Sequence, residues 1–296
     1  MAKAGHEIVF IGKQGTDLSK DGIQFLCDDD LEDWRELIPD DVDIVHLNYP
    51  PDPAKPVDKP VLYTLHGNAK AEDRYPESTV CISKKHAENH HADFYIHNPI
   101  NFDEYPENFL NEKKSLSNFL FLAKASWSVK NLKHALKVTK RLEKHLHIIG
   151  GKTLIPRSYA TSHGFLGGNE KLQVMSQCDA LIFPVRWHEP YGIAVIEAMA
   201  LGMPVFASHY GSLPELIVEG TGQTFESHKE MIKTLSEMSW SFDSRWIRQQ
   251  AIERFNHTQQ ASLYLEAYER VLAGEKLNKG PVYRNLELNP EGLLSF

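Results

Sequence analysis

Short apolar runs recur through the first hundred residues of the chain. They occupy residues 7–12, 22–27, 43–49, 61–67, 78–83 and 93–100. Within these runs apolarity is nearly continuous rather than alternating, which is typical of strands buried on both faces of a parallel sheet. Several intervals between the runs are short, so we expect loops rather than helices to make some of the connections.

A second series of apolar runs begins after a polar and charged stretch at residues 101–118. Its strand candidates are residues 118–124, 145–151, 180–185 and 203–209, with helix candidates at 129–146 and 169–177 between them. Two consecutive series of this kind predict two doubly wound α/β domains that face each other across a cleft. In such sheets ligands bind beyond the carboxyl ends of the strands.

The polar stretch sets the expected domain boundary, because linkers are exposed and rich in polar residues. We place an N-terminal Rossmann-like domain at residues 1–108 and a C-terminal Rossmann-like domain at residues 109–245. Residues 243–274 have a helical pattern, and the tail after them carries too little pattern to assign. We expect the C-terminal part, residues 246–296, to pack back on the N-terminal domain.

Composition narrows the class of protein. Of the 296 residues, 42% are hydrophobic and 24% are charged, as is usual for a globular protein, and the formal net charge is -8. This charge argues against nucleic-acid binding through general phosphate neutralisation, although small anionic ligands remain compatible. Three scattered cysteines without a CxxC spacing, and no apolar stretch of roughly 20 residues, favour a cytoplasmic protein.

The stretch "HEPYGIAVIEAMALG", residues 188–202, is the most informative of the sequence. Glu197 stands within an apolar helical run, and Glu189 lies just before the run. A buried, unpaired carboxylate costs several kcal/mol, so something polar should meet each side chain. One alternative is a salt-bridged core pair, for instance with Arg186.

The same stretch suits a nucleotide sugar. A strand, a loop containing Gly192 and a helix follow one another, and the N-terminus of such a helix offers free N–H groups to a phosphate. Glu197, about one and a half turns into the helix, is within reach of a ribose on that phosphate. Glu189 would meet a sugar on the other side of the phosphates.

The segments "EPYGIAVIE" and "MALGMPVFASHYGSLPELI" resemble the E-x7-E signature, and the sequence after it, of the retaining family-4 glycosyltransferases. Similarity to this family extends over most of the chain, including "AKAGHEIVFIG", "YTLHGN", "IHNPINFDEY" and "NFLFLAKASWSVKNLKHAL". The resemblance implies the two-domain GT-B fold. The implied activity is metal-independent transfer of a sugar from a nucleotide-diphosphate sugar to a glycan or other hydroxyl acceptor, with retained anomeric configuration and no cofactor.

The resemblance also implies roles for individual residues. Glu189 and His66 are the implied catalytic residues at the donor sugar, and Glu197 is the implied ribose ligand. Lys124 and Lys130 fall where the family places cations on the diphosphate, which would neutralise the leaving group. The implied distal-phosphate ligands are the backbone amides of Tyr191, Gly192, Ile193 and Ala194. The alternatives are a solvated loop for the lysines and a hydrogen-bonded strand-end residue for His66.

The sequence departs from the family at its start. The family's opening strand and glycine-rich loop have no counterpart before "MAKAGHEI", so we expect a shortened N-terminal domain. Three explanations stay open: an upstream start, a partner subunit that supplies the missing piece, or a non-catalytic nucleotide-sugar-binding form. A sugar-nucleotide epimerase of the same fold is a further alternative. Lys124 also replaces a more frequent arginine and lacks its bidentate geometry.

Three other motifs favour ordinary structural roles. Asp28 and Asp30 imitate a metal-binding D-x-D, but an acidic turn that caps a helix explains them as well. The histidines of "KHAENHHADFYIH" show no complete zinc-ligand spacing, which favours a solvated helix. The basic helix with Lys133, Lys137, Lys140, Arg141 and Lys144 could make peripheral contact with anionic lipid, but it also fits a surface helix over a sheet.

Overall fold

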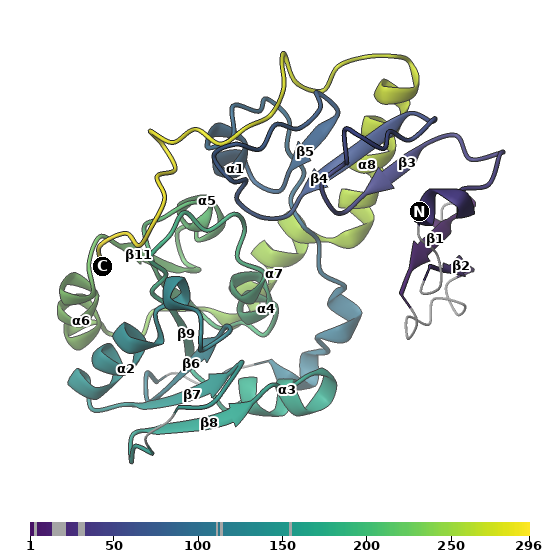
Figure 1. Ribbon diagram of the computed structural model, residues 1–296. Coiled ribbons are helices and arrows are strands. Elements are labelled where there is room, and N and C mark those ends of the chain that lie inside the picture. The colour runs from purple at the N-terminus through teal and green to yellow at the C-terminus, as the bar shows by residue number, and fades with distance from the viewer. Residues whose placement is uncertain (3–4, 14–21, 29–32, 111, 113–114, 154–155) are drawn as a thin grey trace.

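The computed structural model describes residues 1–296 except 3–4, 14–21, 29–32, 111, 113–114 and 154–155. It contains two α/β units, one above the other in Figure 1, each built on a parallel sheet. This arrangement confirms the predicted α/β class with parallel sheets.

The larger unit is built on a six-stranded parallel sheet of order β11-β10-β9-β6-β7-β8. Its strands are β6 (Asn118–Leu122), β7 (His145–Ile149), β8 (Ala160–Gly164), β9 (Ala180–Phe183), β10 (Val205–Ser208) and β11 (Gly222–Phe225). From β6 the chain proceeds outward through β7 and β8, then returns to β9 on the other side of β6. The neighbours β6 and β9 therefore define the switch point, where loops after the two strands diverge and leave a crevice.

Helices cover both faces of this sheet. Alternate residues of β6 face opposite sides: Phe119 and Phe121 pack with α2 (Leu132–Arg141) and α6 (His228–Glu237). Leu120 faces the cluster formed with α3 (Gly168–Met175), α4 (Ile193–Ala200), α5 (Leu213–Leu216) and α7 (Ser244–Phe255). Burial on both faces explains the continuous apolar runs of these strands.

The smaller unit has a three-stranded parallel sheet and a separate strand pair. The sheet comprises β3 (Val45–Leu47), β4 (Val61–Leu65) and β5 (Thr79–Cys81), followed by α1 (Lys84–Glu88). β1 (Val9–Gly12) and β2 (Gln24–Cys27) pair with each other. The strand predicted at 93–100 is reduced to two isolated bridges, one between Cys81 and Tyr95 and one between Ile100 and Asn256. Single turns of 3-10 helix lie at η3 (Trp34–Leu37), η4 (Phe102–Glu104), η5 (Glu107–Phe109) and η6 (Ser128–Lys130).

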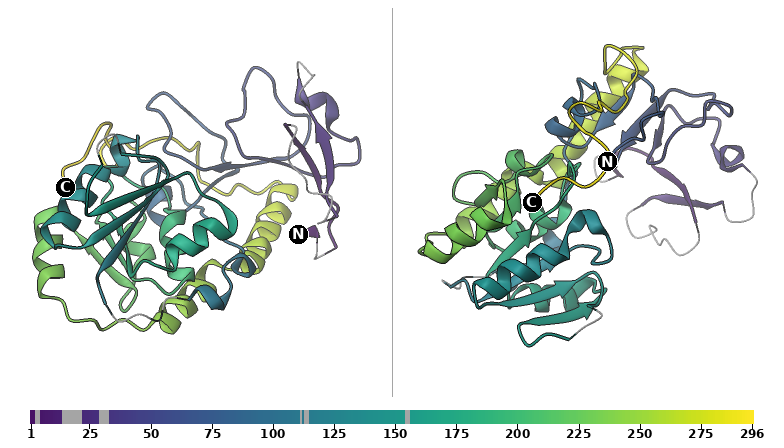
Figure 2. Two further views of the ribbon diagram at one scale, coloured as in Figure 1. Left: turned by 90° about the horizontal axis from the view of Figure 1, so that it is seen from below. Right: turned by 60° about the vertical axis from the view of Figure 1, so that its left-hand side comes forward.

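The helical segment predicted at 243–274 is two helices, α7 and α8 (His257–Leu272), which follow one another along the side of the molecule (Figure 2). The break occurs at Asn256, whose backbone is extended and whose side chain caps α8 by accepting from the Thr258 amide. α7 packs on α4, whereas α8 lies on β4, where Tyr264 Oη is 3.1 Å from Thr64 Oγ1.

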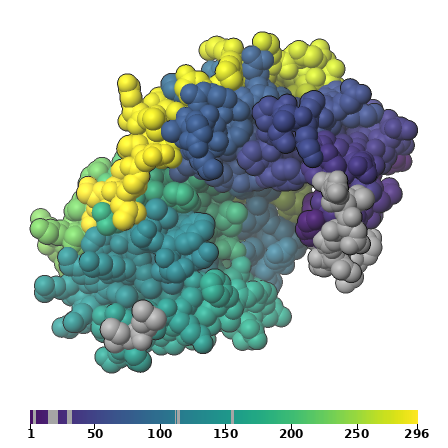
Figure 3. Space-filling model, viewed as in Figure 1, coloured from purple at the N-terminus to yellow at the C-terminus, as the bar shows by residue number. Residues whose placement is uncertain are grey.

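The segment after α8 crosses from the smaller unit to the larger one (yellow in Figure 3). Val282 forms a bridge with Tyr75 beside the three-stranded sheet. Farther along, the Leu294 amide donates to the Arg186 carbonyl at 2.8 Å. Phe296 is buried against the α2 and α6 side of the larger unit. The tail therefore connects both units and reaches the loop that follows β9.

Candidate active site

A cavity of about 310 Å³ lies between the two units, at the carboxyl ends of β6 and β9. The smaller unit contributes His66, Ile82 and Asn98. The larger unit contributes Leu122, Ala123, Trp127, Lys130, Phe183, Trp187, Glu189, Pro190, Tyr191, Gly192, Ile193 and Ala194. The cavity thus lies at the switch point, as expected for a ligand site in an open parallel sheet.

Hydrogen bonds hold the two loops at this switch point against each other. The Arg186 amide donates to the Val129 carbonyl at 2.8 Å. Asn131 Nδ2 donates to the Pro184 carbonyl at 2.7 Å, and the Asn131 backbone is left-handed at the start of α2. The loop after β6 and the loop after β9 therefore form one fixed wall of the cavity.

Glu189 is buried on this wall with two polar partners. Its Oε2 lies 2.6 Å from Lys130 Nζ and accepts from Trp187 Nε1 at 2.7 Å. The Lys130 ammonium also lies over the Trp187 ring, 4.9 Å from its centroid. The partner of Glu189 is therefore Lys130 rather than Arg186, whose Nε donates to the Leu294 carbonyl at 2.5 Å.

Two glycines allow the loop around Glu189 to take its shape. Gly192, which caps α4, has φ +94°, a left-handed conformation that favours glycine. A Cβ on Gly211 would lie 2.2 Å from the Glu189 carbonyl oxygen, so only glycine permits this close approach. The Ser212 amide next to it donates to that oxygen at 2.9 Å. The N-terminus of α4, with Ile193 and Ala194, consequently opens on the cavity.

Glu197 lies one turn further along α4 and has its own partners. Its Oε1 lies 2.6 Å from Lys171 Nζ and accepts from the Tyr105 hydroxyl at 2.5 Å. Burial, and then the charge of Glu197, raise the pKa of Tyr105 above its usual value, which keeps this hydroxyl protonated. Glu197 is not among the residues that line the 310 Å³ cavity. The two carboxylates thus form separate ion pairs on either side of the α4 N-terminus.

The remaining predicted site residues differ in position. His66 lines the cavity, and its Nε2 donates to Asn48 Oδ1 at 2.9 Å. Burial lowers the His66 pKa below 6.5, so its ring is neutral at pH 7. Lys124 is exposed in the loop after β6, with its ammonium 4.8 Å from the Trp127 ring centroid. Lys124 is not among the residues that line the cavity, but it contacts Trp127, which is.

Sequence reasoning missed Lys171 and Tyr105. Lys171 belongs to the first turn of α3, which begins beyond the carboxyl end of β8. This position, in a helix that starts beyond the carboxyl end of a strand, was the signal that could have identified Lys171 as a site residue. Tyr105 is buried within the stretch that we interpreted as a polar linker, and its polar surroundings in the sequence did not indicate a site residue.

Two histidines of the motif, His86 and His90, are part of the core, which corrects the expectation of a solvated helix. His86 and His90 are 1% and 0% exposed. His90 Nε2 accepts from the Ala69 amide, and its Nδ1 donates to the His86 carbonyl. His97 donates to Glu215 at 2.9 Å, joining the two units. Within the described ranges, no group of three or more His, Cys, Asp or Glu side chains could hold a metal ion.

Two further sequence expectations concern metal and membrane. Asp28 pairs with Lys13 at 3.3 Å, while Asp30 lies outside the described residues. Among the helices in the described part of the chain, none has both the length and the apolarity needed to cross a membrane.

Comparison with known proteins agrees with this architecture. Residues 106–240 match the model of the family described as glycosyl transferases group 1. Spore coat protein SA of Bacillus subtilis (strain 168) is 26% identical in a 136-residue alignment that covers 43% of this chain and 35% of that protein. The match therefore spans about a third of the length of this curated relative.

Solved structures extend the likeness to the whole fold. AviGT4, a glycosyltransferase involved in avilamycin A biosynthesis, has a TM-score of 0.74 at 20% identity over 95% of this chain and 88% of that one. Anabaena Alr3699/HepE in complex with UDP-glucose has a TM-score of 0.56 at 16% identity over 72% and 73% of the two chains. The predicted GT-B fold is confirmed. The family match covers most of the larger unit, and the solved structures share the fold of both units.

Proposed function

We propose that this chain is a retaining, metal-independent glycosyltransferase that moves a sugar from a nucleotide-diphosphate sugar to a glycan or other hydroxyl acceptor. The observation that supports this most strongly is the pair of ion pairs, Lys130–Glu189 and Lys171–Glu197, on either side of the α4 N-terminus. The two carboxylates offer hydrogen-bond acceptors at the two ends of a site. The α4 N-terminus at the centre of this site suits phosphate.

The donor would lie along this line of groups. Its phosphates would accept from the free amides at the start of α4, where the helix dipole favours negative charge. Glu189, which lines the cavity, would accept hydrogen bonds from hydroxyls of the transferred sugar. Glu197 would accept from the ribose hydroxyls beside Lys171 and Tyr105.

In this proposal Lys130 also helps to balance the charge of the diphosphate. Each carboxylate is already balanced by a lysine at 2.6 Å, so the site has little net charge before donor binding. A diphosphate adds negative charge, which the α4 N-terminus, Lys130 and the nearby Lys124 would balance. These groups would also stabilise the charge that develops on the leaving diphosphate, and the reaction therefore needs no metal or other cofactor.

The chemical step would exchange two bonds at the anomeric carbon. The bond to the diphosphate oxygen breaks, and a bond to the acceptor oxygen forms on the same face. A phosphate oxygen of the leaving diphosphate takes the acceptor proton. The configuration is retained because the new bond forms on the face from which the diphosphate leaves. His66 stands on the opposite wall of the cavity and would contact the sugar there as a neutral hydrogen-bonding group.

A donor screen tests this function. Purified protein is mixed with UDP-, GDP- or ADP-sugars and a panel of oligosaccharides, and release of nucleoside diphosphate is measured with and without EDTA. UDP-glucose is the first donor to try, because the similar HepE structure contains it. We expect release that EDTA does not change and a product with the donor's anomeric configuration. Loss of release with EDTA, or an inverted product, would contradict the mechanism.

A second candidate is a nucleotide-sugar-binding subunit that needs a partner for catalysis. The separation of the β1-β2 pair from the β3-β4-β5 sheet favours it, because the described residues of the smaller unit do not form one continuous sheet. This candidate predicts that donors bind and raise the melting temperature while no nucleoside diphosphate is released with any acceptor. Release by the purified chain alone would exclude it.

A further inference from the structure

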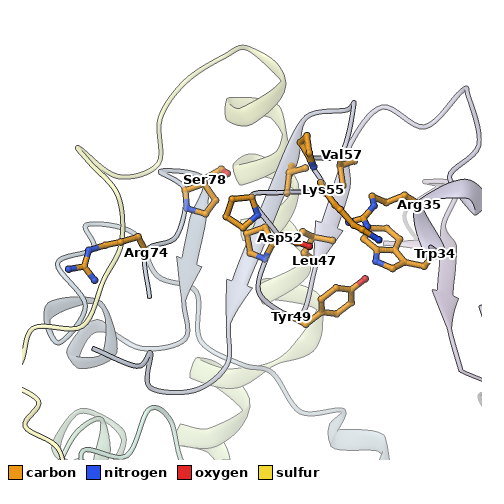
Figure 4. Close-up of a pocket in the computed structure, with 14 residues that line it drawn as sticks. Trp34, Arg35, Leu47, Tyr49, Asp52, Lys55, Val57, Arg74 and Ser78 are labelled. Carbon is orange, nitrogen blue, oxygen red and sulfur yellow. The ribbon is translucent and has the colours of Figure 1, made fainter. Parts of the chain in front are cut away.

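A second and larger cavity, of about 570 Å³, lies entirely within the smaller unit (Figure 4). Leu47 and Val61 form part of its floor, on the face of the β3-β4-β5 sheet that packs away from α8. Its walls come from η3, from the proline-containing loop between β3 and β4, and from the residues just before β5. Its volume is within the range of small-molecule sites.

One end of this cavity presents aromatic surface. The Trp34 and Tyr49 rings stand at 90° with centroids 5.8 Å apart, and Tyr49 is 49% exposed. Such rings pack well on the C–H face of a sugar ring, because both surfaces are apolar and rigid. The aliphatic and proline side chains around them would contact the rest of the same face.

Polar groups at the same end are already held in position. Arg35 donates to Asp33 Oδ2 at 2.7 Å and to the Lys55 carbonyl at 2.9 Å. Lys55 Nζ lies 3.5 Å from the same Asp33 oxygen, and Asp52 Oδ1 accepts from the Ala54 amide. Figure 4 shows Trp34, Arg35 and Lys55 gathered near Tyr49, with Ser78 and Arg74 toward the other end.

This combination of aromatic and polar groups favours one class of ligand over the others. Hydroxyl groups both donate and accept, so a sugar can use the cations, Asp52 and Ser78 together. A simple anion would meet an unfavourable carboxylate at Asp52, and an acyl chain would displace water from the polar groups in the wall without offering them a hydrogen bond. The lining therefore fits a saccharide best.

The cavity is joined to the candidate active site by two consecutive residues. Tyr49 lines the larger cavity and follows Asn48, whose side chain accepts from His66. His66 lines the cavity between the two units. We infer that the 570 Å³ cavity is a second saccharide site, which binds a sugar unit of the acceptor away from the hydroxyl that reacts. This inference rests on the proposed function.

Saccharide binding to four variants tests the inference. The probes are cellotriose, chitotriose and trigalacturonate, measured by saturation-transfer NMR and calorimetry, with decyl phosphate as the lipid-like comparison. Tyr49→Ala removes the exposed ring and Tyr49→Phe keeps it. Trp34→Ala removes the second ring. Trp246→Ala is the matched control, because Trp246 on α7 is also 49% exposed but lies outside this cavity.

We expect at least one trisaccharide to bind the wild type, and Tyr49→Ala and Trp34→Ala to weaken it about tenfold. Tyr49→Phe and Trp246→Ala should bind as the wild type does. Binding of no trisaccharide, equal binding by Tyr49→Ala, or Tyr49-dependent binding of decyl phosphate alone would overturn the inference.

UDP-, GDP- and ADP-glucose are titrated into the same variants as an independent readout. If a nucleotide sugar binds and no trisaccharide binds, the second site is overturned and the proposed function stands. Saccharide binding without any nucleotide-sugar binding overturns the proposed function and leaves the second site standing.

Discussion

The Lys130 ammonium lies 2.6 Å from the Glu189 carboxylate, with the two side chains only 13% and 7% exposed. Both charges are therefore largely removed from water, and each depends on the other for compensation. Trp187 adds one neutral donor to the same carboxylate oxygen. The pair is thus both a structural feature of the unliganded protein and the chemical centre of the proposed donor site.

Lys130→Met should lower the free energy of unfolding by about 2–4 kcal/mol, because it leaves a buried carboxylate without its countercharge. The double variant Lys130→Met with Glu189→Gln should recover most of that loss, since no charge is then left unpaired. Urea denaturation of the wild type, both single variants and the double variant measures this coupling. Additive losses in the double variant would show that the two side chains do not act as a pair.

Tyr105→Phe should destabilise the protein by about 1.5–3 kcal/mol, the usual worth of a hydrogen bond to a charged group. The variant removes the hydroxyl that donates to Glu197 at 2.5 Å and leaves the ring in place. Tyr95→Phe, on a ring that is 38% exposed, is the control and should change stability by less than about 0.5 kcal/mol. Equal effects of the two variants in urea would argue against the Tyr105–Glu197 bond.

Glu215 predicts a pH dependence of the contact between the two units. Burial acts to raise its pKa, but hydrogen bonds from His97 and from the Lys85 and Lys84 amides prevail, so the pKa lies below 4.5. Its contribution to stability is therefore present above pH 4.5 and is lost as the pH falls through the lower folded value.

The stability advantage of the wild type over Glu215→Gln should shrink as the pH falls from about 5 to about 3. Chemical denaturation at several pH values measures it. A difference that stays constant over this range would mean that the Glu215 charge does not stabilise the contact.

The tail contact predicts a local effect on the loop before Glu189. Phe296 is 7% exposed against the larger unit, and two residues earlier Leu294 exchanges hydrogen bonds with Arg186. Phe296→Ala should speed amide exchange at Leu294 and in peptides that contain Arg186, as measured by mass spectrometry. Leu293→Ala, at a side chain that is 46% exposed, is the matched control and should leave exchange unchanged. Unchanged exchange in Phe296→Ala would mean that the tail does not hold this loop.

The strands with buried faces were predictable because their apolarity is continuous, as in β6 and β9. The edge strands β8, "ATSHG", and β11, "GQTF", escaped notice because they lie at the ends of the sheet and carry polar residues. The run at 93–100 is apolar but makes only two isolated bridges, so tertiary packing rather than apolarity decides whether it pairs. The segment after α8 has no periodic pattern because it packs first on the smaller unit and then on the larger one.

Part of the site was also predictable, because some of its residues follow one another closely in the sequence. Glu189, Gly192 and Glu197 belong to one local strand-loop-helix pattern, so their spacing alone indicates a site. Tyr105 and Lys171 meet Glu197 from 92 and 26 positions away, and such contacts arise only when the chain is folded. The sequence predicted that both carboxylates have polar partners, but it did not identify the residues that supply them.

The central claim is that Glu189 and Glu197 bind opposite ends of one nucleotide-diphosphate sugar. Thermal shift with UDP-, GDP- and ADP-glucose should stabilise the wild type, by about 2.7 kcal/mol at a hundredfold excess over the dissociation constant. The control is Asp179→Asn, which changes a buried carboxylate at the amino ends of β6 and β9, where it accepts from the Ser117 and Asn118 amides.

Glu189→Ala and Glu197→Ala should each abolish most of this shift, while Asp179→Asn should keep it. Stabilisation by every donor that survives in Glu197→Ala as it does in Asp179→Asn would contradict the claim.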